Sequence, residues 1–108
     1  MRKAHNKLVR DRIPEIIQSA GKQCAAQVLS EDDYQQALRQ KLIEEAYEAA
    51  VAIGDDLIKE LADLYEVIDG LMLVYHVDRE AVVKIQEQRR SERGGFNERL
   101  RLLWVETE

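Results

Sequence analysis

Two acid-bearing segments between Leu38 and Val74 constrain the fold of this chain more than any other feature. The first contains Glu44-Glu45-x-x-Glu48 and the second contains Glu60-Leu-Ala-Asp63, with a break at Gly54-Asp55 between them. In both segments the apolar residues recur at helical spacing. The pattern therefore predicts two consecutive helices joined by a short turn, each carrying a pair of carboxylates one turn apart.

An advance of about 100° per residue places these acidic side chains around each helix. On the first helix, Glu45 falls inside the apolar arc, while Glu48 lies at its edge beside Lys41. On the second helix, Glu60 flanks the apolar stripe and Asp63 lines up with apolar residues. We therefore expect the acids to face inward or sideways.

Carboxylates gathered on facing helices need a cation, because an unpaired buried carboxylate would otherwise take up a proton. Oxygen ligands without a matching His or Cys favour a hard ion, and Mg²⁺ is commonly held by a few carboxylates together with water and substrate phosphates. Residues at i and i+3 are close enough to share one metal or to hold two adjacent metals. The alternative is a solvated face whose acids have i,i+4 partners.

Length and charge limit the function classes. A chain of 108 residues suits one domain, residues 1–108, and is too short for two ordinary ones. Acidic residues exceed basic ones, 21 against 16, and this argues against nucleic acid as a partner, since a phosphate backbone requires a basic face. Without a long apolar run we expect no membrane span. The polar N-terminal residues do not resemble a signal peptide, so we expect a cytoplasmic protein.

Capping signals outline the first two helices. Pro14 suits the first turn of a short helix that Gly21 would stop. Ser30, followed by three acidic residues, suits the start of a longer helix that can run to about Ile53, where Gly54 would end it.

The next helix is expected from about Asp56 to His76, with Asp55 as its cap, and a further helix is expected after Asp78, which resembles an N-cap. Gly70 inside the first of these indicates close helix packing or, alternatively, room for a ligand. Four helices with little or no strand predict an all-α bundle. The apolar stripes on the two long helices are broad for a lone small bundle, which indicates pairing of subunits.

Arginines near both ends of the chain are candidate anion ligands. Arg10 and Arg12 can be surface charges or salt-bridge partners, and the functional alternative is that one of them reaches a substrate phosphate. Arg93 precedes Gly94-Gly95, whose backbone N–H groups can be exposed to an anion. A Gly-Gly pair after a helix more commonly just ends that helix.

The pattern Lys41-Leu-Ile-Glu44-Glu45-Ala-Tyr-Glu48, followed by Glu60-Leu-Ala-Asp63, resembles the MazG-like all-α nucleoside triphosphate pyrophosphohydrolases, a group that includes phosphoribosyl-ATP pyrophosphohydrolases. The opening Lys7-Leu-Val-Arg-Asp-Arg-Ile-Pro-Glu15 and the ending Arg93-Gly-Gly-Phe96 are similar to a bacterial and phage branch of that group. The resemblance implies a four-helix module, assembled as a homodimer or homotetramer. Such a module uses Mg²⁺, with Mn²⁺ as a substitute, to split (d)NTP into (d)NMP and pyrophosphate.

The same resemblance implies roles for the matching positions. Glu44 and Glu45 would be catalytic, with Glu44 acting beside the metal or binding a further ion. Lys41 and Arg93 would meet phosphate oxygens. The metal ligands would be Glu45, Glu48, Glu60 and Asp63.

The residue types present favour direct attack by water over a covalent intermediate on the enzyme. No Ser, Cys or His is patterned as a nucleophile, so we expect the attacking group to be a metal-activated water. Two alternatives remain open. The substrate could be phosphoribosyl-ATP of histidine biosynthesis, or the chain could be a non-enzymatic helical interaction module whose acids pair with Lys41, Lys59 or the arginines of a partner.

Overall fold

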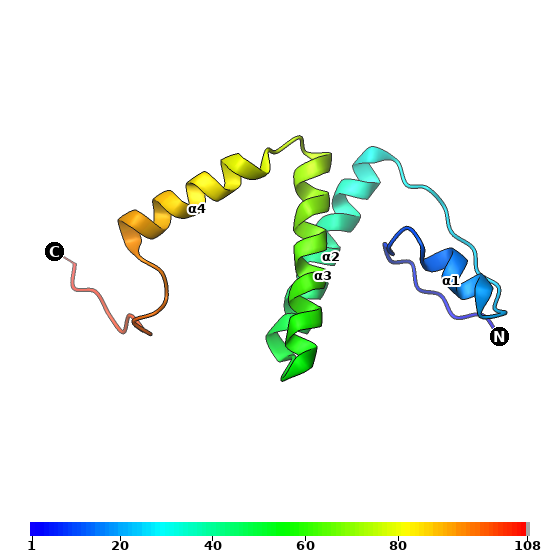
Figure 1. Ribbon diagram of the computed structural model, residues 1–108, viewed down its shortest axis with the longest axis horizontal. Helices are drawn as coiled ribbons and strands as arrows, with labels where there is room; N and C mark the ends of the chain where they lie inside the picture. Colours follow the sequence, from blue (N-terminus) through cyan, green and yellow to red (C-terminus); the bar gives the residue numbers. More distant parts are fainter. Residues whose placement is uncertain (108) are drawn as a thin grey trace. The chain divides into compact units, whose positions relative to one another are not determined.

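The computed structural model describes residues 1–107, which form four helices and no strand (Figure 1). The helices are α1 (Ile13–Ser19), α2 (Glu31–Val51), α3 (Asp55–Val74) and α4 (Arg79–Arg93). The prediction of an all-α chain is therefore confirmed. Over the described residues, no helix combines the length and the apolar character that crossing a membrane requires.

Two compact units make up the chain, and each is described by itself. The first, Met1–His76, contains α1, α2 and α3, and the second begins at Val77 and contains α4. That both units belong to a single domain stays a prediction. All but one of the predicted site residues lie in the first unit.

Local signals set the bounds of α1 and of the start of α2 as predicted. Pro14 lies in the first turn of α1, and after the helix Gly21 adopts a φ of 80°. The Ser30 hydroxyl accepts a hydrogen bond from the backbone N–H of Asp33 at 3.2 Å. The acidic first turn of α2 then complements the partial positive charge of the helix N-terminus.

A short turn reverses the chain between α2 and α3. Helix α2 ends at Val51 rather than near Ile53, because Ala52 already has an extended backbone with ψ 146°. Gly54, with φ 59° and ψ −136°, takes the N-cap position, and Asp55 is the first residue of α3 rather than its cap. Because L side chains rarely adopt that backbone conformation, the glycine determines where the turn occurs.

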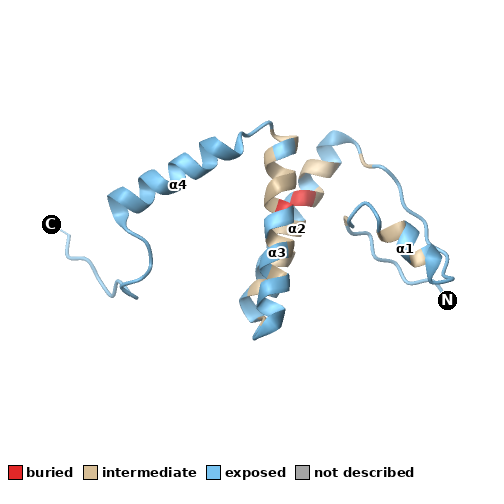
Figure 2. Ribbon diagram, in the orientation of Figure 1, coloured by how far each residue is buried: buried red, intermediate tan, exposed pale blue. Residues whose placement is uncertain are grey.

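The core of the first unit lies between α2 and α3, which run antiparallel and pack against each other (Figures 1 and 2). Among the described residues, the buried hydrophobic side chains are Leu38 and Val67, at 4% and 7% exposure. Arg39 further links the helices, since its Nε donates to the Tyr75 hydroxyl at 2.8 Å and its guanidinium lies over the ring.

Gly70 allows the close approach of α2 and α3. A Cβ atom at this position would lie 3.2 Å from Cδ2 of Leu38 and 3.8 Å from the hydroxyl oxygen of Tyr34. The close-packing interpretation of this glycine is therefore confirmed.

We expect Gly70→Val to lower the free energy of unfolding by about 1–3 kcal/mol, because the added atoms must displace the Leu38 side chain in a closely packed contact. Urea denaturation followed by circular dichroism measures this change. Ala62→Val, on the exposed side of α3, is the matched control. Equal effects of the two substitutions would contradict the packing role of Gly70.

Candidate metal centre

Three carboxylates from α2 and α3 come together in the first unit. One carboxylate oxygen each from Glu45, Glu60 and Asp63 lies within 4.8 Å of the others. Glu45 is the most enclosed, with a side chain 12% exposed. The structure thus brings together three of the four predicted metal ligands, and we call these three residues the acidic trio.

Glu48, the fourth predicted ligand, lies outside the acidic trio. It is exposed on α2, one turn after Glu45. Its negative charge nevertheless contributes to raising the pKa of Glu60, so the carboxylate is close enough to affect the site. A role for Glu48 as a ligand stays a prediction.

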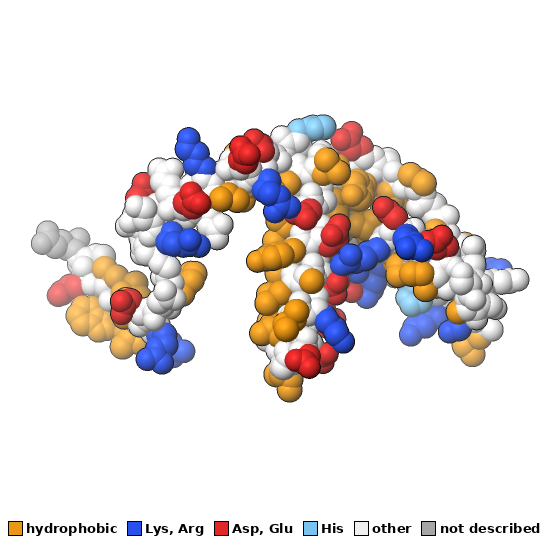
Figure 3. Space-filling view, viewed as in Figure 1, with side chains coloured by type: hydrophobic (Ala, Val, Ile, Leu, Met, Phe, Trp, Pro, Cys, Tyr) orange, Lys and Arg blue, Asp and Glu red, His pale blue; other side chains and the backbone are white. Residues whose placement is uncertain are grey.

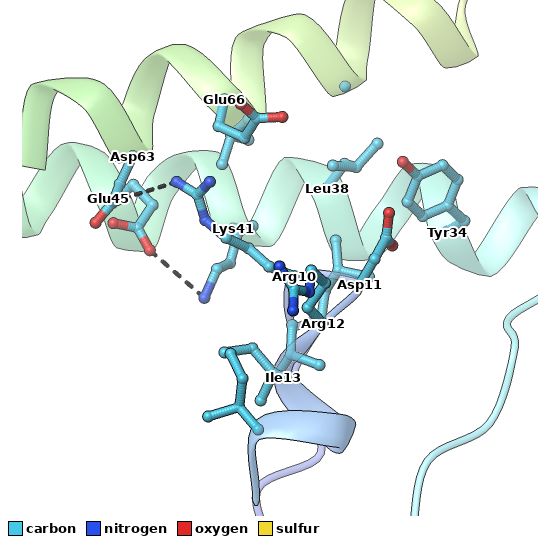
Figure 4. A pocket seen from close by; sticks show the side chains of 15 residues that line it. Arg10, Asp11, Arg12, Ile13, Tyr34, Leu38, Lys41, Glu45, Asp63 and Glu66 are labelled. Atoms are coloured by element: carbon cyan, nitrogen blue, oxygen red, sulfur yellow. Dashed lines mark hydrogen bonds and ion pairs between the residues drawn. The ribbon is translucent and has the colours of Figure 1, made fainter. Parts of the chain in front are cut away.

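Two cationic side chains contact the acidic trio from different elements (Figure 4). Lys41, on α2, places its Nζ 3.4 Å from Oε1 of Glu45 and 3.6 Å from Oε2 of Glu44. Arg10, on the segment before α1, donates to Oδ1 of Asp63 at 2.8 Å. Two of the three residues predicted to bind phosphate therefore lie beside the acids.

Lys7 is a neighbour of the site that sequence reasoning missed. Its Nζ lies 3.1 Å from Oε1 of Glu44, whereas Lys41 approaches the other oxygen of the same carboxylate. The hydrogen bond from Lys7, aided by the charge of Lys41, lowers the pKa of Glu44 against the opposing effect of burial. The signal available in the sequence was the position of Lys7 at the start of the motif that runs to Glu15.

The other arginines singled out in the sequence lie elsewhere. Arg12 pairs through its Nε with Glu15, one turn away on α1. Arg93 is the last residue of α4, where Gly94 follows with a φ of 83°. Because Arg93 belongs to the second unit, its contact with a phosphate stays a prediction.

The donor set fits a hard divalent cation. Two oxygen ligands of one Mg²⁺ lie at most about 4.2 Å apart, twice the metal–oxygen distance, so small side-chain rotations suffice to bring the acidic trio around one ion. The pKa of Glu60 is raised, first by partial desolvation and then by negative neighbours, so the folded chain concentrates charge that a cation would relieve. These neighbours are Asp63, Glu45, Glu48 and Asp56.

This raised pKa gives a prediction for the metal-free protein. Because the pKa of Glu60 is higher in the folded than in the unfolded chain, its ionised form destabilises the fold at neutral pH. This penalty fades as the pH falls through the folded-state pKa. We therefore expect Glu60→Gln to raise the melting temperature at pH 7 in EDTA, and the gain to shrink at lower pH.

Thermal melts of Glu60→Gln across a pH series measure this gain. Glu44→Gln is the comparison, because we expect it to lower the melting temperature at pH 7. The pKa of Glu44 is lowered, so its ionised form stabilises the fold above the unfolded-state pKa, and this stabilisation is lost in acid. A lower melting temperature of Glu60→Gln at pH 7 would contradict the charge repulsion described for the acidic trio.

A groove of about 650 Å³ adjoins the acidic trio, between residues 8–16 and the helices α2 and α3. Glu45 and Asp63 line one part of it together with Lys41 and Arg10, as Figure 4 shows. This volume falls within the range of about 300–1,000 Å³ that small-molecule sites occupy. The acids and their cations therefore border a space in which a ligand can bind.

Comparisons with known proteins assign no activity to this arrangement. No protein-family model matches the chain, and no solved structure is significantly similar to it. An uncharacterised protein of Mycolicibacterium smegmatis is 48% identical over 53 residues, which cover 49% of this chain and 54% of that protein. The chain thus spans about half the length of the curated relative that it matches.

Proposed function

We propose that this chain is a Mg²⁺-dependent nucleoside triphosphate pyrophosphohydrolase of the MazG-like type, which cleaves (d)NTP to (d)NMP and pyrophosphate in the cytoplasm. The observation that carries the proposal is that carboxylate oxygens of Glu45, Glu60 and Asp63, from two facing helices, lie within 4.8 Å of one another. Phosphate binding also requires positive charge and space for the ligand. Cationic side chains and a groove of ligand size lie beside these acids.

In this proposal the acidic trio holds the metal, with Glu48 able to join from the next turn of α2. Mg²⁺ bound there would neutralise charge on the phosphate oxygens and activate the attacking water. Glu44, kept ionised between Lys7 and Lys41, is the carboxylate that we assign to accept the proton of that water.

Arg10 and Lys41 are the residues that we assign to the phosphates. The pair between Arg10 and Asp63 is exposed, at 56% and 42% of the two side chains, and such pairs contribute at most about 1 kcal/mol. The guanidinium can therefore leave Asp63 at little cost and bind phosphate oxygens in the bidentate manner that its planar shape allows. Lys41 offers a second positive charge from α2.

Assembly as a homodimer or homotetramer is part of the proposal. The first unit buries few side chains, and large apolar residues stay exposed on α2 and α3, some of them visible along α3 in Figure 3. A second subunit would remove this surface from water. The exposed residues include Ile43, Tyr47, Ile58, Tyr65 and Leu73.

Identification of the products tests the proposed reaction. Incubation of the wild-type protein with dNTPs and Mg²⁺, followed by ³¹P NMR, is expected to show a nucleoside monophosphate and pyrophosphate in equal amounts. A nucleoside diphosphate with free phosphate would instead show attack on the terminal phosphorus, and this would contradict the proposal.

One observation favours a second candidate, the helical interaction module. Arg10 and Lys41 already compensate part of the acidic charge within the chain. This is expected if the acids only stabilise the fold or bind a partner protein. Such a module would bind no Mg²⁺, and the dependence of its melting temperature on Mg²⁺ distinguishes the two candidates.

A further inference from the structure

The part of the groove remote from the acidic trio has a different chemistry. Tyr34, Leu38, Lys41 and Glu45 follow one another along one face of α2 at spacings of four, three and four residues, and all of them line the groove. This series extends for about 16 Å along the helix axis. In Figure 4 Glu45 and Lys41 lie at one end of the series, and Leu38 and Tyr34 lie at the other.

Leu38, Val67 and Gly70 make the remote end apolar, and two polar groups border it. These are the Tyr34 hydroxyl and the Asp11 carboxylate, and neither has a hydrogen-bond partner among residues 1–107.

Arg12 also lines the groove, but its guanidinium is paired with Glu15. At the opposite end, Arg10 and Lys41 are paired with Asp63 and Glu45, so a metal on the acidic trio is what would leave these two cations free for phosphates. The proposed metal site therefore favours an orientation with the phosphates at that end and the apolar part of the ligand at the remote end.

We propose, building on the proposed function, that the remote end binds the base of the nucleotide and that Tyr34 and Asp11 determine which base is accepted. The parts of Leu38 and Val67 that line the groove are apolar, and the ring of Tyr34 beside them offers a face against which a flat heterocycle can pack. An ionised carboxylate only accepts hydrogen bonds, so Asp11 selects bases whose edge presents N–H donors there. The hydroxyl of Tyr34 can donate or accept.

Steady-state kinetics on a panel of dNTPs tests this assignment with Tyr34→Phe and Asp11→Asn. Each variant is expected to raise KM for the preferred nucleotide about three- to tenfold, as loss of one hydrogen bond predicts, with kcat little changed. The ratio of kcat/KM between bases should also fall. Glu31→Gln, which alters an exposed residue of α2 outside the groove, is the control and should leave both quantities unchanged.

A binding experiment without turnover separates this proposal from the proposed reaction. The four common nucleoside 5′-monophosphates are titrated into ¹⁵N-labelled protein in EDTA. We expect the backbone signals of Asp11, Tyr34 and Gly70 to shift with the preferred monophosphate, and the shift to weaken in Tyr34→Phe. Such shifts without any triphosphate hydrolysis would support the base site and contradict the reaction. Hydrolysis without shifts at these residues, or with unchanged base preference in both variants, would overturn the base site.

Discussion

Replacing Glu45 by glutamine is expected to reduce pyrophosphate release by about three orders of magnitude while leaving the helices intact. Glu45 is the most enclosed member of the acidic trio and the one that Lys41 contacts. Glutamine keeps the shape of the side chain but removes the negative charge that holds a cation, and the loss of several kcal/mol of transition-state stabilisation has an effect of this size. Initial rates at saturating Mg²⁺ measure it.

The control for this variant must separate lost chemistry from lost structure. Circular dichroism should show unchanged helix content in Glu45→Gln, because the substitution occurs on a helix surface that stays partly accessible. Glu87→Gln, on the exposed surface of α4, should retain the wild-type rate. A near-normal rate of Glu45→Gln at saturating Mg²⁺ would show that Glu45 is not a metal ligand.

Mg²⁺ is expected to raise the melting temperature of the wild-type protein. A ligand that binds the folded state alone stabilises it by about 1.4 kcal/mol when its concentration is ten times Kd. For a domain of this size that corresponds to a rise of roughly 5–10 °C. Differential scanning fluorimetry with Mg²⁺ and with EDTA measures the shift.

The same measurement on Asp63→Asn shows whether the acidic trio is the site of binding. This variant should lose most of the Mg²⁺-dependent rise, because it removes one ligand charge, whereas Glu87→Gln should keep it. K⁺ at equal ionic strength controls for screening of surface charge. An equal rise in Asp63→Asn and in the wild-type protein would place the cation elsewhere, and no rise in either would favour the interaction module.

Local patterns predicted the helices well because the signals lie within a few residues of each boundary. Ser30 and Asp78 act as N-caps as expected, each accepting a hydrogen bond from the backbone N–H of a residue in the following turn. The turn before α3 was misplaced by one residue. Its geometry depends on the backbone freedom of Gly54 rather than on a side-chain cap, and a sequence shows this less directly.

The candidate site was predictable where it depends on helix periodicity, and not where it depends on distant contacts. Helical spacing indicated that Glu45, Glu60 and Asp63 face inward or sideways, and one carboxylate oxygen of each does lie within 4.8 Å of the others. Lys7 is 37 residues from Glu44 in the sequence, and its contact follows from the path of the segment before α1. No local pattern encodes that path, so the groove that this segment borders was also not foreseen.

Pyrophosphate release from the common ribo- and deoxyribonucleoside triphosphates and from phosphoribosyl-ATP, with Mg²⁺ and with EDTA, tests the central claim most directly. We predict Mg²⁺-dependent release from one or a few nucleoside triphosphates and none in EDTA. Preferential hydrolysis of phosphoribosyl-ATP would keep the reaction and change the substrate. No release from any compound by the folded protein in the presence of Mg²⁺ would contradict the claim that this chain is a pyrophosphohydrolase.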